Sequence, residues 1–209
     1  AFNQLIADID AKYILFSYNN TGDRANNRSN AKIKDGDIIA ALEKKGKVFI
    51  EEKVVDLAKI LSKFKGNMKL YVINFTEIQK IIGIKCPKEY YITIMRRFMM
   101  RIATTVANKY EYKALFTGES IGQVASQTLE SMAAINAVTN IPILRPLASM
   151  DKHDIIEISR EIGTYETSIL PYEDCCTVFV PENPVIKPLI SICEDGEKEL
   201  DIDKLVEDA

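Results

Sequence analysis

The sequence predicts an α/β fold built on a parallel sheet with helices on both faces, and three observations lead to that prediction. Short apolar runs typical of strands alternate with segments of helical periodicity from residue 47 to residue 163. The helical segments are long enough to serve as right-handed crossovers between parallel strands. The chain has 209 residues, of which 47% are hydrophobic and 27% charged, as expected of a globular domain with a sizeable core.

The expected elements follow from apolar patterns and from start and stop signals. Strands are expected at residues 12–17, 47–50, 68–75, 114–117 and 142–147. Helices are expected at residues 35–46, 51–64, 89–110, 120–138 and 151–163, of which the first and the last begin with Asp and end with Gly. Ligands of such sheets bind beyond the carboxyl ends of the strands, which places Thr117 and Gly118 at the ligand-binding edge.

Composition and charge limit the classes of function. No apolar run approaches the roughly 18 residues of a membrane-spanning helix, and no signal peptide is recognised. Four cysteines do not form a disulfide framework, so a cytoplasmic location is expected. The net charge of −3 argues against a self-sufficient nucleic-acid binder. Residues 194–209 carry eight acidic and two basic side chains and are expected to be a solvated tail with at most one helical turn.

The stretch ALFTGESIGQVASQTLESM, at residues 114–132, has the clearest functional pattern. A helix that begins just after a strand presents free backbone N–H groups, and Gly118 permits a close approach of a ligand. Gln123 and Gln127 are four residues apart on one helical face, where their amides can contact a base or a ribose. A capped helix that packs on the sheet through its small residues explains the same pattern, and both interpretations stay open on physical grounds.

Several motifs together resemble one enzyme family. They are FTGESIGQVASQTLESM, NFTEIQKII, YITIMRRFMMRIA and ILRPLASMDKHDIIEISREIGTYETSILPYEDCCTVFVP. Over about residues 51–190 the chain strongly resembles the catalytic domain of the tRNA 4-thiouridine sulfurtransferases, which also supply sulfur for thiamine biosynthesis. The resemblance implies an adenine nucleotide α-hydrolase (PP-loop, Rossmann-like) fold and Mg-ATP as cofactor. It implies ATP contacts at Arg96, Gly118 and Gln127, and a persulfide-handling role for Cys175 in PYEDCC.

The implied chemistry is physically reasonable. Transfer of an adenylyl group from ATP turns a uridine oxygen into a good leaving group, and a persulfide sulfur, supplied by a cysteine desulfurase, then attacks. Arg96 can neutralise phosphate charge, although a solvated helix face explains it as well. Cys175 and Cys176 can equally be half-buried structural thiols. The resemblance implies tRNA and a cysteine desulfurase as partners and no membrane, and it leaves a homodimer open. The single His and the lack of a CxxC pair predict no protein-bound metal.

The sequence departs from the family pattern at its N-terminal side. The Ser-Gly-Gly-x-Asp-Ser phosphate loop does not occur in it. Residues 1–50, with SYNN, resemble instead the C-terminal part of adenine-specific DNA methyltransferases, without their catalytic motif. We therefore expect a methyltransferase-like fragment at 1–50, an incomplete PP-loop domain at 51–190 and the acidic tail at 191–209. The RNA-binding domains of the sulfurtransferases are also missing from the sequence.

Three functions are compatible with this organisation. The first is an ATP-dependent tRNA sulfurtransferase domain that is impaired by the loss of the phosphate loop. The second is a non-catalytic α/β remnant or fusion protein with at most weak nucleotide binding. The third is a DNA methyltransferase remnant.

Overall fold

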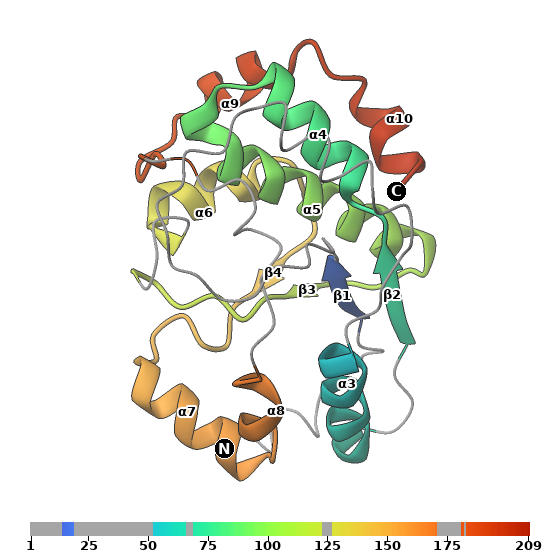
Figure 1. Cartoon of the computed structure of the whole chain (residues 1–209), viewed down its shortest axis with the longest axis vertical. Coiled ribbons are helices and arrows are strands. Elements are labelled where there is room, and N and C mark those ends of the chain that lie inside the picture. Colours follow the sequence, from blue (N-terminus) through green and yellow to red (C-terminus); the bar gives the residue numbers. More distant parts are fainter. Residues whose placement is uncertain (1–13, 19–51, 66–68, 123–126, 171–180, 182) are drawn as a thin grey trace.

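The computed structural model describes residues 14–18, 52–65, 69–122, 127–170, 181 and 183–209 (Figure 1). The strands are β1 (Ile14–Tyr18), β2 (Lys69–Ile73), β3 (Leu115–Phe116) and β4 (Ile143–Leu144). The helices are α3 (Glu52–Lys65), α4 (Thr76–Lys85), η1 (Lys88–Tyr90, a 3-10 turn), α5 (Tyr91–Lys109), α6 (Leu129–Asn136), α7 (Lys152–Glu161), α8 (Tyr165–Ser168), α9 (Ile190–Glu197) and α10 (Ile202–Glu207). The helix expected at 35–46 and the strand expected at 47–50 lie outside the described residues.

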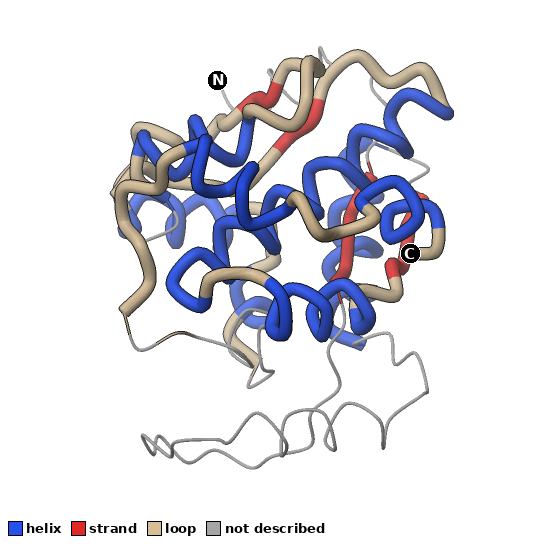
Figure 2. Tube along the Cα trace, turned by 90° about the horizontal axis from the view of Figure 1, so that it is seen from above, coloured by secondary structure: helices blue, strands red, loops and turns tan. Residues whose placement is uncertain are grey.

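All described strands pair in parallel, as predicted. β1 pairs with β2 from Ile14 opposite Lys69 to Tyr18 opposite Ile73, and β3 pairs with β4 at Leu115 opposite Ile143. Figure 2 shows the two strand pairs at separate places in the molecule. The first 50 residues contribute one described strand, β1, and the other three come from the part of the chain between residues 51 and 180. The expected α/β class with a parallel sheet is confirmed.

Helices cover the strands on both sides (Figure 1). Helices α4, α5, α6, α9 and α10 lie on one side, and α3, α7 and α8 lie on the other. Helix α5 is central to the first group because it packs against α4, α6, α9 and α10. Its inward face, which includes Ile94, Met95 and Phe98, is almost completely buried. Helix α5 therefore lies in the core, and its side chains can reach the ends of the strands.

The single helix expected over 120–138 is wrong in its first half. Helix α6 begins only at Leu129, after Thr128, whose side chain accepts a hydrogen bond from the Ser131 backbone N–H. Ahead of it, Gly122 has φ of 80°, a left-handed conformation that ends any regular helix. At residues 120 and 121 the expectation failed because Ser120 and Ile121 bond across to the segment after β4 instead of within a helical turn. Gln123 lies outside the described residues.

The solvated acidic tail expected over 194–209 is also wrong. This part of the chain contains the second half of α9 and all of α10, and both helices pack against α5. Cys193 and Glu197 are buried one turn apart on α9, and Leu200, between α9 and α10, is buried as well. The backbone N–H of Asn74 donates to the carbonyl of Ala209 at 3.2 Å, so the end of the chain lies beside β2. The many acidic residues of this segment led us to overlook the few side chains that are buried.

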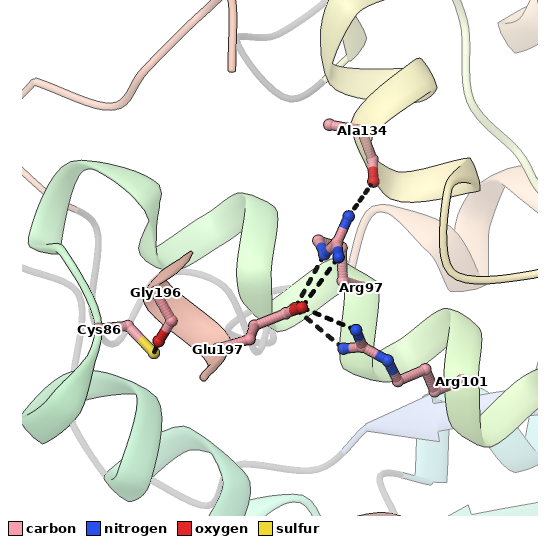
Figure 3. Close-up of polar contacts among 6 residues, drawn as sticks. All are labelled: Cys86, Arg97, Arg101, Ala134, Gly196 and Glu197. Carbon is pink, nitrogen blue, oxygen red and sulfur yellow. Dashed lines mark hydrogen bonds and ion pairs between the residues drawn. The ribbon is translucent and has the colours of Figure 1, made fainter. Parts of the chain in front are cut away.

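Glu197 holds the C-terminal helices onto α5 through buried ion pairs (Figure 3). Arg97 donates to its two carboxylate oxygens at 2.8 and 2.9 Å, and Arg101 does so at 2.9 and 2.7 Å. Arg97 also donates to the carbonyl of Ala134 on α6 at 2.7 Å. Burial alone would raise the pKa of Glu197, but hydrogen bonds and charge from Arg101 and Arg97 outweigh it and lower that pKa. The ion pair of Glu197 and Arg97 thus links α9 to α5 and, through Arg97, to α6.

None of the helices in the described ranges is both long enough and apolar enough to cross a membrane.

Candidate functional site

The segments that follow β3 and β4 lie side by side at the carboxyl ends of these strands. The Thr117 backbone N–H donates to the carbonyl of Leu144 at 3.1 Å, and that of Ile121 donates to Ala148 at 3.1 Å. The Ser120 hydroxyl donates to the carbonyl of Met150 at 2.8 Å. Residues 117–122 therefore form an ordered loop rather than the first turns of a helix. Its position agrees with the sequence prediction that Thr117 and Gly118 lie at the ligand-binding edge.

Glu119 is the centre of a polar network at this edge. Its carboxylate accepts hydrogen bonds from Arg96 of α5, from Arg145 Nε at 2.6 Å and from the Thr117 hydroxyl at 2.9 Å. Arg145 immediately follows β4, and its other guanidinium nitrogen donates to Asn136 of α6 at 2.7 Å. The network thus ties together one core helix, both strand ends and α6. Each guanidinium is fixed by at least one carboxylate contact.

Two partly exposed arginines lie at the rim of the network, around a buried carboxylate. The side chain of Glu119 is 3% exposed, whereas those of Arg96 and Arg145 are 18% and 12% exposed. Two guanidinium groups share this carboxylate, and both are partly exposed at the carboxyl edge. Arginines in this setting suit bidentate contacts with phosphate oxygens. The arrangement can therefore bind an anion at the carboxyl edge without a large rearrangement.

Gly118 and Gln127 lie on the same segment as this network. A Cβ atom built at Gly118 would meet no atom within 4 Å, so packing within the protein does not require glycine there. The side-chain Oε1 of Gln127 is buried and has no hydrogen-bond partner among the described residues, and its backbone carbonyl accepts from Gly122 at 2.9 Å. Open space and an unsatisfied polar atom are features of a site built for a ligand. The predicted roles of Arg96, Gly118 and Gln127 in ATP binding stay predictions.

Cys175, the predicted sulfur-handling residue, and its neighbour Cys176 lie outside the described residues. The two described cysteines are buried free thiols, Cys86 and Cys193. Burial raises the pKa of Cys86 to about 11, and burial also raises the pKa of Cys193. Both thiols therefore stay protonated near neutral pH and are poor nucleophiles. Within the described ranges, no group of three or more His, Cys, Asp or Glu side chains could hold a metal ion.

Sequence reasoning missed Glu119 and Arg145, the two residues that organise the site. A usable signal was present for Glu119, a charged residue just after the strand expected at 114–117, whereas Arg145 lies inside the strand expected at 142–147 and follows β4 only in the structure. In a parallel sheet these positions meet at one edge, and charges there are typical of ligand sites. The actual pairing of the two residues is a tertiary contact across 26 positions of sequence, which no local pattern specifies.

Comparisons with known proteins identify the family of the chain. The profile of the family described as thiamine biosynthesis protein (ThiI) matches residues 40–202. A probable tRNA sulfurtransferase of Brevibacillus brevis is 62% identical over 158 residues, covering 76% of this chain and 40% of the relative. Another, of Lachnoclostridium phytofermentans, is 56% identical over 161 residues, covering 76% of this chain and 41% of the relative. This chain thus spans about two fifths of the length of the curated relatives it matches.

A solved structure supports the same fold. The crystal structure of a 4-thiouridine synthetase in complex with RNA and bound ATP matches with a TM-score of 0.71 at 42% sequence identity. The match covers 75% of this chain and 42% of that chain. The expected PP-loop type of α/β fold is therefore confirmed, as is the family resemblance over about residues 51–190. The resemblance of residues 1–50 to DNA methyltransferases finds no support in these comparisons. The division at residues 50 and 190 stays a prediction.

Proposed function

Because the chain belongs to the thiamine biosynthesis protein (ThiI) family, we propose that it is catalytic-domain sequence of an ATP-dependent tRNA sulfurtransferase. The proposed reaction introduces 4-thiouridine into tRNA, and the same sulfur supply serves the thiazole of thiamine. The names of the relatives support tRNA as the substrate, and the ATP and RNA bound to the similar 4-thiouridine synthetase support the cofactor and the substrate class. We place the reaction in the cytoplasm, with a cysteine desulfurase as the sulfur donor. A homodimer remains open.

The single observation that carries the proposal is the network around Glu119. It fixes Arg96 and Arg145 at the carboxyl edge of β3 and β4, directly beside the open space at Gly118. A nucleotide needs donors that are already oriented toward its phosphates, because reorganising them on binding would cost affinity. Glu119 acts here as a positioning residue, since its carboxylate restricts both guanidinium groups.

The residues present fit an adenine nucleotide. Arg96 and Arg145 would hold phosphate oxygens, and the Gly118 backbone could approach the ligand because no Cβ intervenes. The buried Oε1 of Gln127 could accept a hydrogen bond from an amino group of the base or from a ribose hydroxyl. When bound, ATP supplies the adenylyl group that turns the uridine oxygen into a leaving group.

We assign the sulfur-handling role to Cys175, with Cys176 as the alternative. The support is the PYEDCC motif together with the properties of the other two thiols. Cys86 donates to the carbonyl of Gly196 at 3.3 Å in the interior, and its raised pKa makes it a poor nucleophile. Cys193 is fully buried in α9. Neither described cysteine is suited to carry a persulfide that must reach a bulky RNA.

We further propose that this chain, assayed as it is, binds ATP more weakly than a relative with a Ser-Gly-Gly-x-Asp-Ser turn. The 209 residues contain no such turn, whose backbone N–H groups would surround the pyrophosphate. Each hydrogen bond to a charged group contributes roughly 1.5–3 kcal/mol, so losing two or three of them lowers affinity by about 10²–10⁶. The same observation favours a second candidate, a non-catalytic α/β protein with at most weak nucleotide binding.

Isothermal titration with Mg-ATP tests the proposal, paired with a thiolation assay that contains tRNA and a cysteine desulfurase. Replacing Arg145 by Ala should weaken nucleotide binding about tenfold or more. The matched control is Arg160→Ala on α7, which removes an arginine that lies against Tyr165, away from the Glu119 network. Weak binding that depends on Arg145 but not on Arg160 supports the site.

Three other results are informative. Turnover with micromolar ATP affinity would show that the chain is not impaired. Binding without any thiolation would favour the second candidate. Equal effects of the two arginine substitutions, or no binding by the unaltered chain, would contradict the assignment of the ATP site.

A further inference from the structure

Three tyrosines and two lysines form a partly exposed cluster at the far end of α5 from the Glu119 network. The Tyr110 ring stacks with that of Tyr112 at a centroid distance of 5.9 Å and an interplanar angle of 28°. Tyr71 of β2 tilts against Tyr110 at 5.6 Å. The ammonium groups of Lys69 and Lys109 lie 5.2 and 5.8 Å from the centre of the Tyr110 ring. We call these five residues the tyrosine–lysine surface.

The turn that holds the two stacked rings has an unusual conformation. Tyr110 ends α5, and Glu111 follows with φ of 58°, a left-handed conformation that normally favours glycine. The Glu111 backbone N–H donates to Asn108 at 3.2 Å, and that of Tyr112 donates to Ala107 at 2.8 Å. These two bonds are those of a Schellman motif, which closes a helix end firmly. Tyr110 and Tyr112 are therefore presented on a defined turn despite the cost of a non-glycine residue at its centre.

The surface is accessible and positively charged. Tyr110 is 38% exposed, whereas Tyr71 and Tyr112 are half-buried and pack against the apolar core. Lys69, Lys109 and Lys113 are all exposed, and Glu111 is the one acidic residue within the turn. Partial burial, and then Tyr110 and Tyr112, raise the pKa of Tyr71 to about 12, so its phenol stays neutral near physiological pH. Within this turn and at the start of β2, three lysines thus lie near the tyrosine rings together with one carboxylate.

We propose that the tyrosine–lysine surface binds a single-stranded segment of RNA, with an unpaired base against the exposed part of Tyr110 and its phosphates beside the lysines. Stacked aromatic rings among basic side chains are how proteins bind single strands without strict sequence preference. A purely acidic protein partner would use the lysines but would have no need of exposed, stacked rings. The choice of RNA over single-stranded DNA rests on the proposed function, whereas the choice of a single strand rests on the cluster itself.

The surface is separate from the proposed ATP site. Arg96 and Tyr110 lie 14 residues apart on α5 and at its end, which corresponds to about 21 Å along the helix axis. Tyr112 precedes β3, whereas Thr117 follows it, so the two sites lie at opposite ends of that strand. An RNA bound here would contact the domain at a second place, and its binding need not depend on ATP.

Fluorescence anisotropy with the full chain tests the proposal, with a labelled single-stranded RNA of about 12 nucleotides at low salt as the probe. Tyr110→Leu should weaken binding about fivefold or more, because one stacked base contributes roughly 1–3 kcal/mol. Tyr110→Phe keeps the ring and should retain binding. The matched control is Tyr165→Leu, because Tyr165 also lies against a cation, with Arg160 Cζ 4.6 Å from its ring.

Two further variants change the charge and leave the fold intact. Lys69→Gln combined with Lys109→Gln should weaken binding and flatten the salt dependence by a slope of about 1.4, since each phosphate contact of a single strand contributes about 0.7. Glu111→Asn, whose side chain tolerates the left-handed conformation, should tighten binding about twofold or more, because it removes the acidic charge.

The outcomes separate this proposal from the proposed function. Loss of RNA binding in Tyr110→Leu with unchanged ATP titration supports the surface as a distinct site. Equal loss in Tyr165→Leu, equal affinity for a duplex of the same sequence, or competition by poly-glutamate as effective as by unlabelled RNA would overturn it. ATP binding by a chain that binds no single-stranded RNA would overturn the surface and leave the proposed function standing.

Discussion

Two clusters of one glutamate and two arginines lie in different surroundings in this molecule. Glu197 and Glu119 are both 3% exposed, and each is contacted by two arginines. Around Glu197 both oxygens are bound by each arginine in the helical interior, where Arg97 is 2% exposed. Around Glu119 the arginines reach the surface at the carboxyl edge of the strands. The first cluster lies in the packed helical interior, whereas both arginines of the second are partly exposed where the strands end.

Neighbouring residues of one helix supply the two clusters. Arg96 and Arg97 are adjacent on α5, and successive helical side chains point about 100° apart, so one can face the sheet edge and the other the helical interior. Residue type therefore does not separate a structural arginine from a ligand-binding one. What separates them is the number of partners already satisfied and the access of solvent.

The largest expected effect follows from breaking the buried cluster. Replacing Glu197 by Ala leaves the buried guanidinium of Arg97 without its carboxylate, and removing one partner of a buried ion pair costs about 3–5 kcal/mol. We expect the free energy of unfolding, measured by urea titration, to fall by this amount. Glu194→Ala is the matched control because this residue is exposed on the same helix and should have little effect. Equal stability of the two variants would mean that the cluster is dispensable.

The same substitution at the two neighbouring arginines sharpens the comparison. Arg97→Lys cannot bind both oxygens of Glu197 and the Ala134 carbonyl at once, so it should lower the free energy of unfolding by about 1–3 kcal/mol. Arg96→Lys should cost less stability but should weaken Mg-ATP binding more. Urea titration and calorimetry of both variants measure this reversal. If both variants lose stability and affinity in the same proportion, the two clusters do not have separate roles.

The pH dependence of stability should carry the signature of Glu197. Its folded-state pKa is lowered below the ordinary value of about 4.3. Its contribution to the free energy of unfolding is therefore present above that pH and is lost as pH falls through the folded-state pKa. The stability difference between the unaltered chain and Glu197→Gln should therefore be constant near neutral pH and shrink below about pH 4. Urea titrations across this range check the effect. A difference that grows on acidification would contradict the sign of the shift.

The parts that the sequence predicted are those that local patterns control. Alternating strands and helices, the parallel pairing and the edge position of Thr117 and Gly118 all follow from periodicity and topology. Helix α7 begins as predicted, with Asp151 accepting from the backbone N–H groups of His153 and Asp154.

The parts that the sequence did not predict depend on distant pairing. Glu197 meets Arg97 and Arg101 across 100 and 96 positions, and Glu119 meets Arg96 across 23. Charge density made 194–209 look solvated because a count of acidic residues does not show which of them is buried. Residues 120–122 were expected to be helical because they follow a strand, but they bond instead to the segment after β4, and Gly122 has φ of 80°.

The smallest expected effect on stability is also the most specific test of the open site. A Cβ at Gly118 would meet nothing within 4 Å, so Gly118→Ala should change the free energy of unfolding by less than about 0.5 kcal/mol. If a nucleotide approaches the backbone there, the added methyl group occupies that space and should weaken Mg-ATP binding about tenfold. Gly196→Ala is the informative contrast, because its Cβ would lie 3.0 Å from Pro87 in the packed interior and should alter stability rather than ligand binding. Calorimetry and urea titration of the two variants would therefore assign one glycine to the ligand site and one to the core. Unchanged ATP affinity in Gly118→Ala would show that the space beside Gly118 is not where the nucleotide lies.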